Sequence, residues 1–308
     1  MTPYIGNAPY CYANATAMLL ACHGEAIDAG TIECLTGVGI GARWWRRDEA
    51  IYFSVVPPDV GVSRALALLG FDFIEEVGGD GAPPPYAEIR ARLATGPVMI
   101  GPLDMVHLSY LPNARDLAGV DHYVLLTQLF DDHARLHDPY GYPNVRLELD
   151  DLARAWEARA VSYRRAPYRY WAKPSRIASP GESDLRRAAI AAFRSTYAAS
   201  GSTPPTEDIL IGPAAYEAAA CRIRKGEADA LLGLLKHFGL PLGARRAHDL
   251  ALFLRSGDAS LADLKREQSE AFIDGYRHVI DGEIARVADS ILMIGDLDER
   301  FGRRLRAS

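Results

Sequence analysis

The chain has 308 residues, of which 49% are hydrophobic and 24% charged, so its composition supports a packed globular core and excludes wholesale disorder. Its formal net charge is −6, and no Lys/Arg stripe with interleaved aromatic residues is present, which argues against a nucleic-acid-binding protein. No window offers eighteen unbroken apolar residues, and we expect no membrane-spanning segment. The length fits two domains or one large one.

Up to about residue 172, short apolar stretches alternate with Gly- and Pro-containing turns. Periodicity and turn residues predict helices over 12–23, 31–35, 63–70, 83–96 and 149–158, and strands over 71–77, 97–103, 122–129 and 134–141. The last two strands form a predicted hairpin across Asp131–Asp132. Because helices come first and the strands then cluster, the order favours an α+β fold with an antiparallel sheet.

The Pro-, Ser- and Gly-containing stretch 173–183 is the predicted linker, after which the chain becomes rich in Ala, Leu, Arg and Glu. Helical spacing predicts helices over 184–199, 213–225, 227–238, 243–255 and a long one from 260 to 290 or beyond, with no strand. We therefore expect two domains, 1–172 and 173–308, the second all-helical.

The stretch YIGNAPYCYANATAMLLACHG, residues 4–24, delivers Cys11 to the first turn of an apolar helix. The unpaired N–H groups and the dipole of a helix N-terminus stabilise a thiolate, and the same N–H groups can hold an oxyanion. Cys11 is thus a candidate nucleophile. The alternative is a buried cysteine that packs as a small hydrophobic residue, and this stretch alone favours the alternative.

A nucleophilic cysteine needs a base, and His122 lies where a loop enters the strongest predicted strand. The neighbouring strand ends in Asp138–Pro139, so a carboxylate could hold the imidazole through Nδ1. A two-residue turn at 131–132 sets His122 opposite Gly141, three positions past Asp138, so we expect a bulge or strong twist to close the gap. The alternative is a rim histidine and a turn aspartate.

A cysteine on an early helix, a later His-Tyr-Val before an apolar strand, and Asp-Pro after a hairpin resemble papain-like cysteine enzymes. The chain is most similar to the butirosin biosynthesis protein H-like family, on the stretches CYANATAMLLACHG, IECLTGVGIGARWW, PVMIGPLDMVHLSYLP and DHYVLLTQL with LHDP. The resemblance implies a papain-like N-terminal domain and a helical C-terminal domain. It carries over Cys11 as nucleophile, His122 as general base and acid, and Asp138 as the residue that orients His122.

The resemblance also implies an activity, namely transfer of an acyl group from a carrier-protein or coenzyme A thioester, through an acyl-enzyme on Cys11, to an amine in natural-product biosynthesis. The donor would bring its own phosphopantetheine arm, so we expect no resident cofactor. The rival hypotheses are a cysteine hydrolase or peptidase and a non-catalytic binding module. The acyl group, the acceptor and the oligomeric state stay open, a homodimer being one option.

For the further site residues the sequence leaves alternative roles open. Papain-like enzymes often place a Gln before the cysteine to complete the oxyanion hole, and here Asn7 is the nearest amide. Asp104 could bind a cationic amine or cap a loop, and Trp44 and Trp45 could line a cleft or close the core. Tyr140, in the turn after Asp138, is a candidate substrate contact.

The remaining cysteines, Cys22, Cys34 and Cys221, are interpreted as packing residues. They show no CxxC pairing and no histidine at zinc spacing, so we expect no metal site. The N-terminus lacks the basic and apolar regions of a signal peptide, which together with the unpaired cysteines predicts a cytoplasmic protein with reduced thiols.

Overall fold

The computed structural model describes residues 3–6, 10–202 and 208–307. The chain divides into two compact units: unit 1 comprises residues 1–32 and 58–180, and unit 2 comprises residues 33–57 and 181–308. The expected division at residue 172 differs from this one in two respects. The first unit extends to residue 180, and a segment from the N-terminal part of the chain belongs to the second unit.

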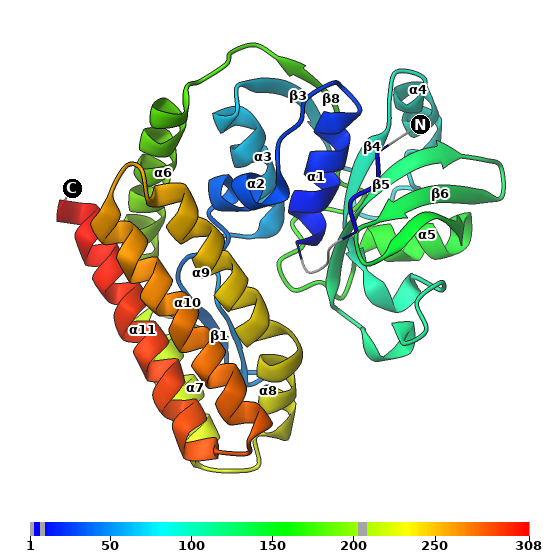
Figure 1. The fold of residues 1–308 in the computed structure, drawn as a ribbon. Coiled ribbons are helices and arrows are strands. Elements are labelled where there is room, and N and C mark those ends of the chain that lie inside the picture. The colour runs from blue at the N-terminus through cyan, green and yellow to red at the C-terminus, as the bar shows by residue number, and fades with distance from the viewer. Residues whose placement is uncertain (1–2, 7–9, 203–207, 308) are drawn as a thin grey trace. The chain divides into compact units, whose positions relative to one another are not determined.

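Unit 1 is built around one antiparallel sheet with helices on both faces (Figure 1). Its elements are α1 Cys11–Ala21, α3 Pro58–Leu68, β3 Phe71–Glu76, α4 Tyr86–Leu93, β4 Val98–Asp104, η1 Met105–His107, η2 Ala114–Asp116, β5 Asp121–Leu129, β6 His133–Asp138, β7 Tyr142–Glu148, α5 Leu149–Glu157 and β8 Tyr170–Arg176. The strand order is β3-β8-β4-β5-β6-β7, and neighbouring strands run antiparallel. The predicted antiparallel sheet is confirmed.

Alternation along β5 explains how the sheet takes helices on two faces. Val124 and Leu126 belong to a core cluster with residues of α4 and α5, such as Trp156. Tyr123, on the other face, makes an edge-on ring contact with Tyr12 of α1. Consequently β5 is buried on both sides, which accounts for its nearly continuous apolar sequence.

Strand β8 overlaps the stretch predicted as a linker, so that prediction is wrong for residues 173–176. It pairs with β3 on one side and, at Trp171 and Tyr170, with β4 on the other. Proline within a strand argued against a strand here, because proline cannot donate to the ladder. The register shift between Asp72 and Ile74 of β3 leaves Lys173 and Pro174 in a bulge, which is how the strand accommodates the proline.

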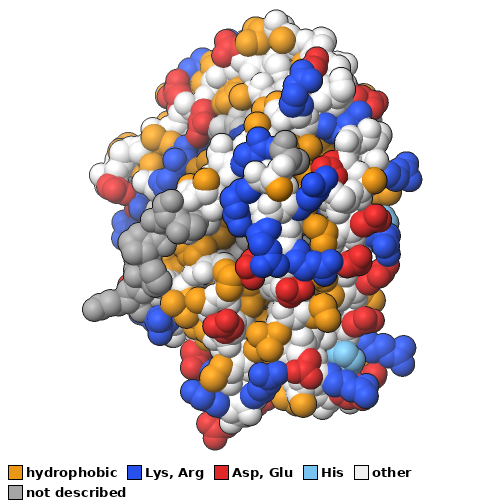
Figure 2. Space-filling model, turned by 90° about the vertical axis from the view of Figure 1, so that its left-hand side faces the viewer, with side chains coloured by type: hydrophobic (Ala, Val, Ile, Leu, Met, Phe, Trp, Pro, Cys, Tyr) orange, Lys and Arg blue, Asp and Glu red, His pale blue; other side chains and the backbone are white. Residues whose placement is uncertain are grey.

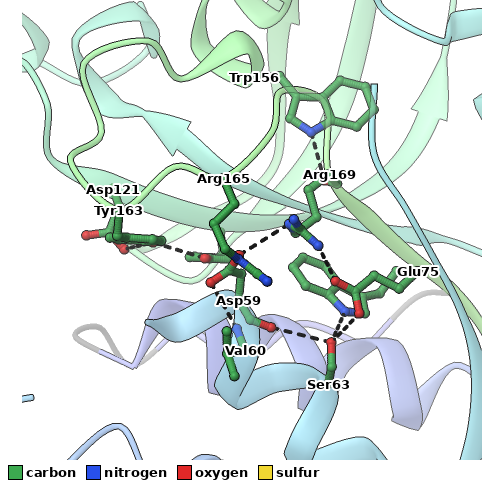
Figure 3. Close-up of polar contacts among 11 residues, drawn as sticks. Asp59, Val60, Ser63, Glu75, Asp121, Trp156, Tyr163, Arg165 and Arg169 are labelled. Carbon is green, nitrogen blue, oxygen red and sulfur yellow. Dashed lines mark hydrogen bonds and ion pairs between the residues drawn. The ribbon is translucent and has the colours of Figure 1, made fainter. Parts of the chain in front are cut away.

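A buried ionic network fixes α3 against the sheet of unit 1 (Figure 3). The Asp59 carboxylate, in the first turn of α3, forms ion pairs with Arg165 at 2.7 Å and with Arg169 at 3.3 Å. Arg169 also forms an ion pair with Glu75 of β3. The carbonyl of Arg169 accepts the N–H of Gly101 in β4. These contacts hold α3 against the sheet and tie Arg169 to both β3 and β4.

Unit 2 is mainly helical and contains a small sheet (Figure 1). Its elements are β1 Arg43–Trp45, β2 Ala50–Tyr52, α6 Glu182–Ser202, β9 Ile209–Ile211, α7 Pro213–Arg224, α8 Asp229–Leu234, η3 Leu235–Gly239, α9 Leu240–Leu254, α10 Ala259–Ile280 and α11 Ile284–Ala307, while α2 Ala29–Thr36 crosses the boundary between the units. The expectation of no strand is wrong, because β9 pairs with β1. The predicted long helix is two helices that a turn at Gly282 separates.

Residues 33–57 join unit 2 through both apolar and polar contacts. Phe53 packs against the rings of Tyr216 and Phe272 from the helices. The buried carboxylate of Asp298 in α11 accepts the N–H of Gly41 at 3.3 Å and the hydroxyl of Tyr197 at 2.5 Å. A domain boundary drawn from composition alone therefore missed this segment, because its partners lie more than 150 residues further along the chain.

Basic side chains, Lys and Arg drawn in blue, gather on the face of the molecule shown in Figure 2, with carboxylates between them. In unit 2, Arg304 of α11 donates to the hydroxyl of Ser260 at 2.7 Å, and Arg303 pairs with Glu299 at 3.0 Å. The charge of Arg303 is partly offset by Glu299, and that of Arg304 by the Asp258 carboxylate at 3.8 Å. Among the helices that the structure describes, none is both long enough and apolar enough to cross a membrane.

Candidate active site

Cys11 is the first residue of α1, as the sequence predicted. Tyr12 to Leu20 are buried, whereas Cys11 itself is half-buried. The preceding residue, Tyr10, places no side-chain cap on the helix, and the first turn holds no acidic residue. The sulfur therefore lies at the positive end of the helix dipole, and no carboxylate of the first turn opposes a developing oxyanion.

The structure brings Cys11, His122 and Asp138 together. His122 of β5 hydrogen-bonds to the Cys11 thiol, and its Nε2 lies 2.6 Å from Oδ1 of Asp138 at the end of β6. Both His122 and Asp138 are buried. The expected use of Nδ1 for the carboxylate is wrong, since Nε2 makes that contact and Nδ1 is left to face the thiol.

A bulge in β5 closes the gap that the hairpin register left. Near the turn, Leu129 pairs with Ala134 in the expected register, but the register shifts by one residue between Leu126 and Gln128. Continuing the shifted register sets Asp138 opposite Val124, two residues from His122 and on the same face of the sheet. Without the extra residue, the two side chains would point to opposite faces. The bulge is therefore a requirement of the site.

Among the described residues, three side-chain hydrogen bonds hold the carboxylate of Asp138. Besides His122, it accepts the hydroxyl of Tyr110 at 2.7 Å on Oδ2 and the backbone N–H of Tyr140 at 2.7 Å on Oδ1. Tyr110 was not predicted as a site residue, although it is the tyrosine of the Leu-x-Tyr element in the sequence. That motif marked its position, but only the fold shows that its hydroxyl reaches a residue 28 positions away.

His122 and Asp138 shift each other's pKa values in the direction opposite to the effect of burial. Burial lowers the pKa of His122, but the charge and hydrogen bond of Asp138, with a further contribution from Cys11, outweigh it and hold that pKa well above its ordinary value. Burial likewise raises the pKa of Asp138, yet His122, Tyr110 and the N–H of Tyr140 leave it below its ordinary value. The Asp138 carboxylate therefore stabilises the imidazolium that forms when His122 takes up a proton.

Competing effects act on the pKa of the Cys11 thiol. Burial raises the pKa of its thiol, the hydrogen bond and charge of His122 lower it, and Asp121 raises it further, so that the net shift is upward. The backbone N–H of Tyr123 donates to the sulfur and favours the thiolate. The thiol of the free protein is thus paired with a base but is not a low-pKa thiolate.

The helical part of the chain matches a known domain family. Residues 205–306 match the model of the YobF C-terminal domain. Over 310 aligned residues the chain is 33% identical to "Uncharacterized protein YobF" of Bacillus subtilis (strain 168), an alignment that covers 98% of this chain and 97% of that protein. The chain belongs to the YobF family. The whole-length match includes the segment that carries Cys11, His122 and Asp138, whereas the domain model covers none of them.

In this YobF-family chain, the other predicted site residues have different outcomes. Asn7 lies outside the described residues. Asp104 is buried, and its Oδ1 accepts the backbone N–H groups of Val106 and Gly119, which favours its alternative role as a loop cap. Tyr140 is exposed, and its ring meets that of His122 edge-on with centroids 6.3 Å apart.

The two tryptophans belong to unit 2 of the YobF-family fold. Trp44 is buried in its core and Trp45 is half-buried in β1, so Trp44 takes the core role that the sequence left open. Of the other cysteines, Cys34 is buried as expected, Cys22 is half-buried, and Cys221 is exposed, contrary to its interpretation as a packing residue. The outward face of α7 carries Cys221, which apolar composition around it did not reveal.

Among the side chains that the structure describes, no group of three or more His, Cys, Asp or Glu residues is arranged to hold a metal ion. Chemically, the arrangement can transfer a proton between the Cys11 sulfur and Nδ1 of His122, while the carboxylate of Asp138 holds the other ring nitrogen.

Proposed function

We propose that this chain is a cysteine-dependent acyltransferase whose catalytic unit has a papain-like fold. The observation that carries the proposal is the arrangement of Cys11, His122 and Asp138, with the sulfur at a helix N-terminus, the base beside it and a buried carboxylate behind the base. Independent residues from a helix and two strands meet here, and each has the role that nucleophilic catalysis requires.

The first half-reaction acylates Cys11. His122 Nδ1 takes the thiol proton, the sulfur attacks the carbonyl carbon of a thioester, and the carbon–sulfur bond to the donor breaks. The departing thiolate takes the proton from His122. A thioester is already activated, so the protein has chiefly to position it and to stabilise the oxyanion, for which the N–H groups at the start of α1 are available.

In the second half-reaction, an amine attacks the acyl group on Cys11. A carbon–nitrogen bond forms, the carbon–sulfur bond breaks, and the amine proton passes to His122 and then to the Cys11 thiolate. The donor would be an acyl carrier protein or an acyl-coenzyme A, because both present their acyl group on a phosphopantetheine thiol. The resemblance to the butirosin biosynthesis protein H-like family points to the same chemistry.

The test is incubation with an acyl thioester of N-acetylcysteamine, the end of the phosphopantetheine arm, followed by intact mass measurement. We expect one acyl group on the wild-type protein and none on Cys11→Ala. Cys221→Ala is the matched control, because it removes an exposed thiol and should retain the adduct. An adduct that survives Cys11→Ala and disappears with Cys221→Ala would overturn the proposal.

Product analysis then separates transfer from hydrolysis. Amide formation with an added amine supports the acyltransferase. Release of the free acid at the same rate with and without amine would instead identify a cysteine hydrolase that uses the same three residues. A thiol that is neither acylated nor alkylated faster than the exposed Cys221 would favour a non-catalytic module.

A further inference from the structure

The outer face of the small sheet in unit 2 carries a positive charge. Alternation along β1 turns Trp44 into the core of the unit, whereas Arg43 and Trp45 point to the opposite face and are half-buried. The neighbouring strands follow the same division, because Ile51 is buried in that core and Leu210 packs against it. Helices of unit 2 therefore cover one side of the sheet, and Arg43 lies on the other.

Apolar side chains flank Arg43 on this outer face. The register of the sheet sets Arg43 opposite Tyr52 of β2 on one side and opposite Ile211 of β9 on the other. Trp45 lies two residues further along β1 and points the same way. Tyr52 is 41% exposed, and Trp45 and Ile211 are half-buried, so the face remains open to solvent. The guanidinium is therefore bordered by two aromatic rings on a surface that a ligand can reach.

Arg43 lacks a counter-ion. Its guanidinium donates to the backbone carbonyl of Val55, and it forms no ion pair with any residue that the structure describes. Burial lowers the pKa of Arg43, and no described carboxylate opposes that shift. A carbonyl dipole does not neutralise a cation, so a half-buried guanidinium without an anion carries a cost in free energy. An anion that binds there removes this cost.

Two more cations follow in the turn between β1 and β2. Arg46 and Arg47 are exposed, and neither forms an ion pair within the described part of the chain. The same turn holds Asp48, which is exposed, and Glu49, which pairs with Arg222 of α7 at 2.6 Å. Because Arg222 already offsets one of the two carboxylates, positive charge prevails on this hairpin and attracts anions to the open face.

We infer that the outer face of β1 binds the carboxylate or phosphate group of a small molecule through Arg43, with the apolar part of that molecule against Tyr52 and Trp45. A guanidinium binds both oxyanions through paired N–H groups, and the carbonyl of Val55 accepts from only one of its nitrogens. The two rings offer apolar surface beside the charge. The ligand class is therefore an aryl or alkyl oxyanion.

This site is independent of the proposed acyl transfer. Arg43, Tyr52 and Trp45 belong to unit 2, whereas Cys11 and His122 belong to unit 1. The binding experiment therefore needs no thioester and no active thiol, and its result leaves the proposed function untouched.

Calorimetric titration and thermal unfolding of the whole chain test the inference, in a buffer without carboxylate or phosphate. The probes are phenyl phosphate and benzoate, with benzamide as the uncharged analogue and inorganic phosphate as the anion without a ring. We expect an aryl anion to bind and to raise the melting temperature, and benzamide to do neither. Inorganic phosphate should bind about tenfold more weakly than phenyl phosphate, because it has no ring to contact the aromatic side chains.

Arg43→Gln should weaken binding of the aryl anion about tenfold or more, as for the loss of a charge-assisted hydrogen bond. Arg47→Gln is the matched control, because it removes an exposed cation of the same hairpin and should change the affinity by no more than about twofold. Tyr52→Ala removes an exposed ring and should narrow the difference between phenyl phosphate and inorganic phosphate.

Each outcome decides for or against the site. Binding of one aryl anion alone supports it and tells a phosphate ligand from a carboxylate ligand. The inference is wrong if neither aryl anion binds, if benzamide binds as well as benzoate, or if Arg43→Gln and Arg47→Gln have the same affinity. If Arg43→Gln does not fold, Tyr52→Ala decides, because an unchanged preference for phenyl phosphate places the ligand elsewhere.

Discussion

Removal of the Tyr110 hydroxyl tests the buried part of the site directly. Tyr110→Phe deletes one oxygen atom and keeps the ring, which packs against Tyr142. Asp138 is 0% exposed, so water cannot replace the lost donor at Oδ2. A hydrogen bond to a charged group contributes about 1.5–3 kcal/mol, so we expect the free energy of unfolding to fall by that amount at neutral pH. For a unit of this size, the melting temperature should fall by roughly 3–12 °C.

The pH dependence gives this prediction its sharpest form. The folded-state pKa of Asp138 is lowered, so its ionised form contributes stability above the unfolded pKa near 4 and loses it as the pH falls through the folded value. The Tyr110 hydroxyl donates to that ionised form. The difference between wild type and Tyr110→Phe should therefore be full at pH 7 and shrink as the pH falls below about 4.

Chemical denaturation of both proteins at pH 7 and at acid pH measures the difference. Tyr142→Phe is the matched control, because it removes a hydroxyl from the neighbouring ring and leaves the Tyr110–Asp138 hydrogen bond intact. An equal loss of stability at the two pH values, or the same loss in Tyr142→Phe, would refute the reasoning, since neither result can arise from a bond to the Asp138 carboxylate.

Two further predictions concern titrating groups. His122→Ala should slow alkylation of Cys11 by iodoacetamide at pH 7, because His122 lowers the pKa of the thiol against the effect of burial. The rate should fall about tenfold for each unit by which the thiol pKa rises. If the alkylation rate of His122→Ala depends on pH as that of the wild type does, the prediction is wrong. In unit 2, burial lowers the pKa of Lys265 to about 8, although Asp298 opposes the shift. Relative to Lys265→Met, the wild-type protein should gain stability as the pH rises from about 8 to 10.5, by at most about 3 kcal/mol, and denaturation curves at pH 7.5 and 10 would show the change.

Much of unit 1 could be predicted because its strands and helices carry local signals. The apolar run after His122 gave β5, and glycine and proline at the ends of other segments gave most helix limits. Strand β8 was missed because Pro174 masks it, and β1 with β2 were missed because three residues are too short to show a period. Segment 33–57 was assigned to the first domain rather than the second, because only tertiary contacts reveal its partners.

The site shows the same division between local and distant signals. Cys11, His122 and Asp138 could be proposed from residue type and neighbourhood, and the structure brings the three side chains together. The hairpin register showed that a bulge was needed, but its position in β5 could not be predicted, because nothing in the side chains of Thr127 or Gln128 marks it. The contact of Tyr110 with Asp138 depends on the path of the loop between β4 and β5, which hydrophobic periodicity does not encode.

The balance of charge around Cys11 bears on how the site would form its nucleophile. Burial raises the pKa of the Cys11 thiol, and the hydrogen bond and charge of His122 lower it without cancelling the effect of burial. The thiol therefore keeps its proton until His122 takes it, and the Asp138 carboxylate stabilises the imidazolium that forms. Under the proposed function, this proton transfer has to accompany the attack on the thioester, because no low-pKa thiolate stands ready in the free protein.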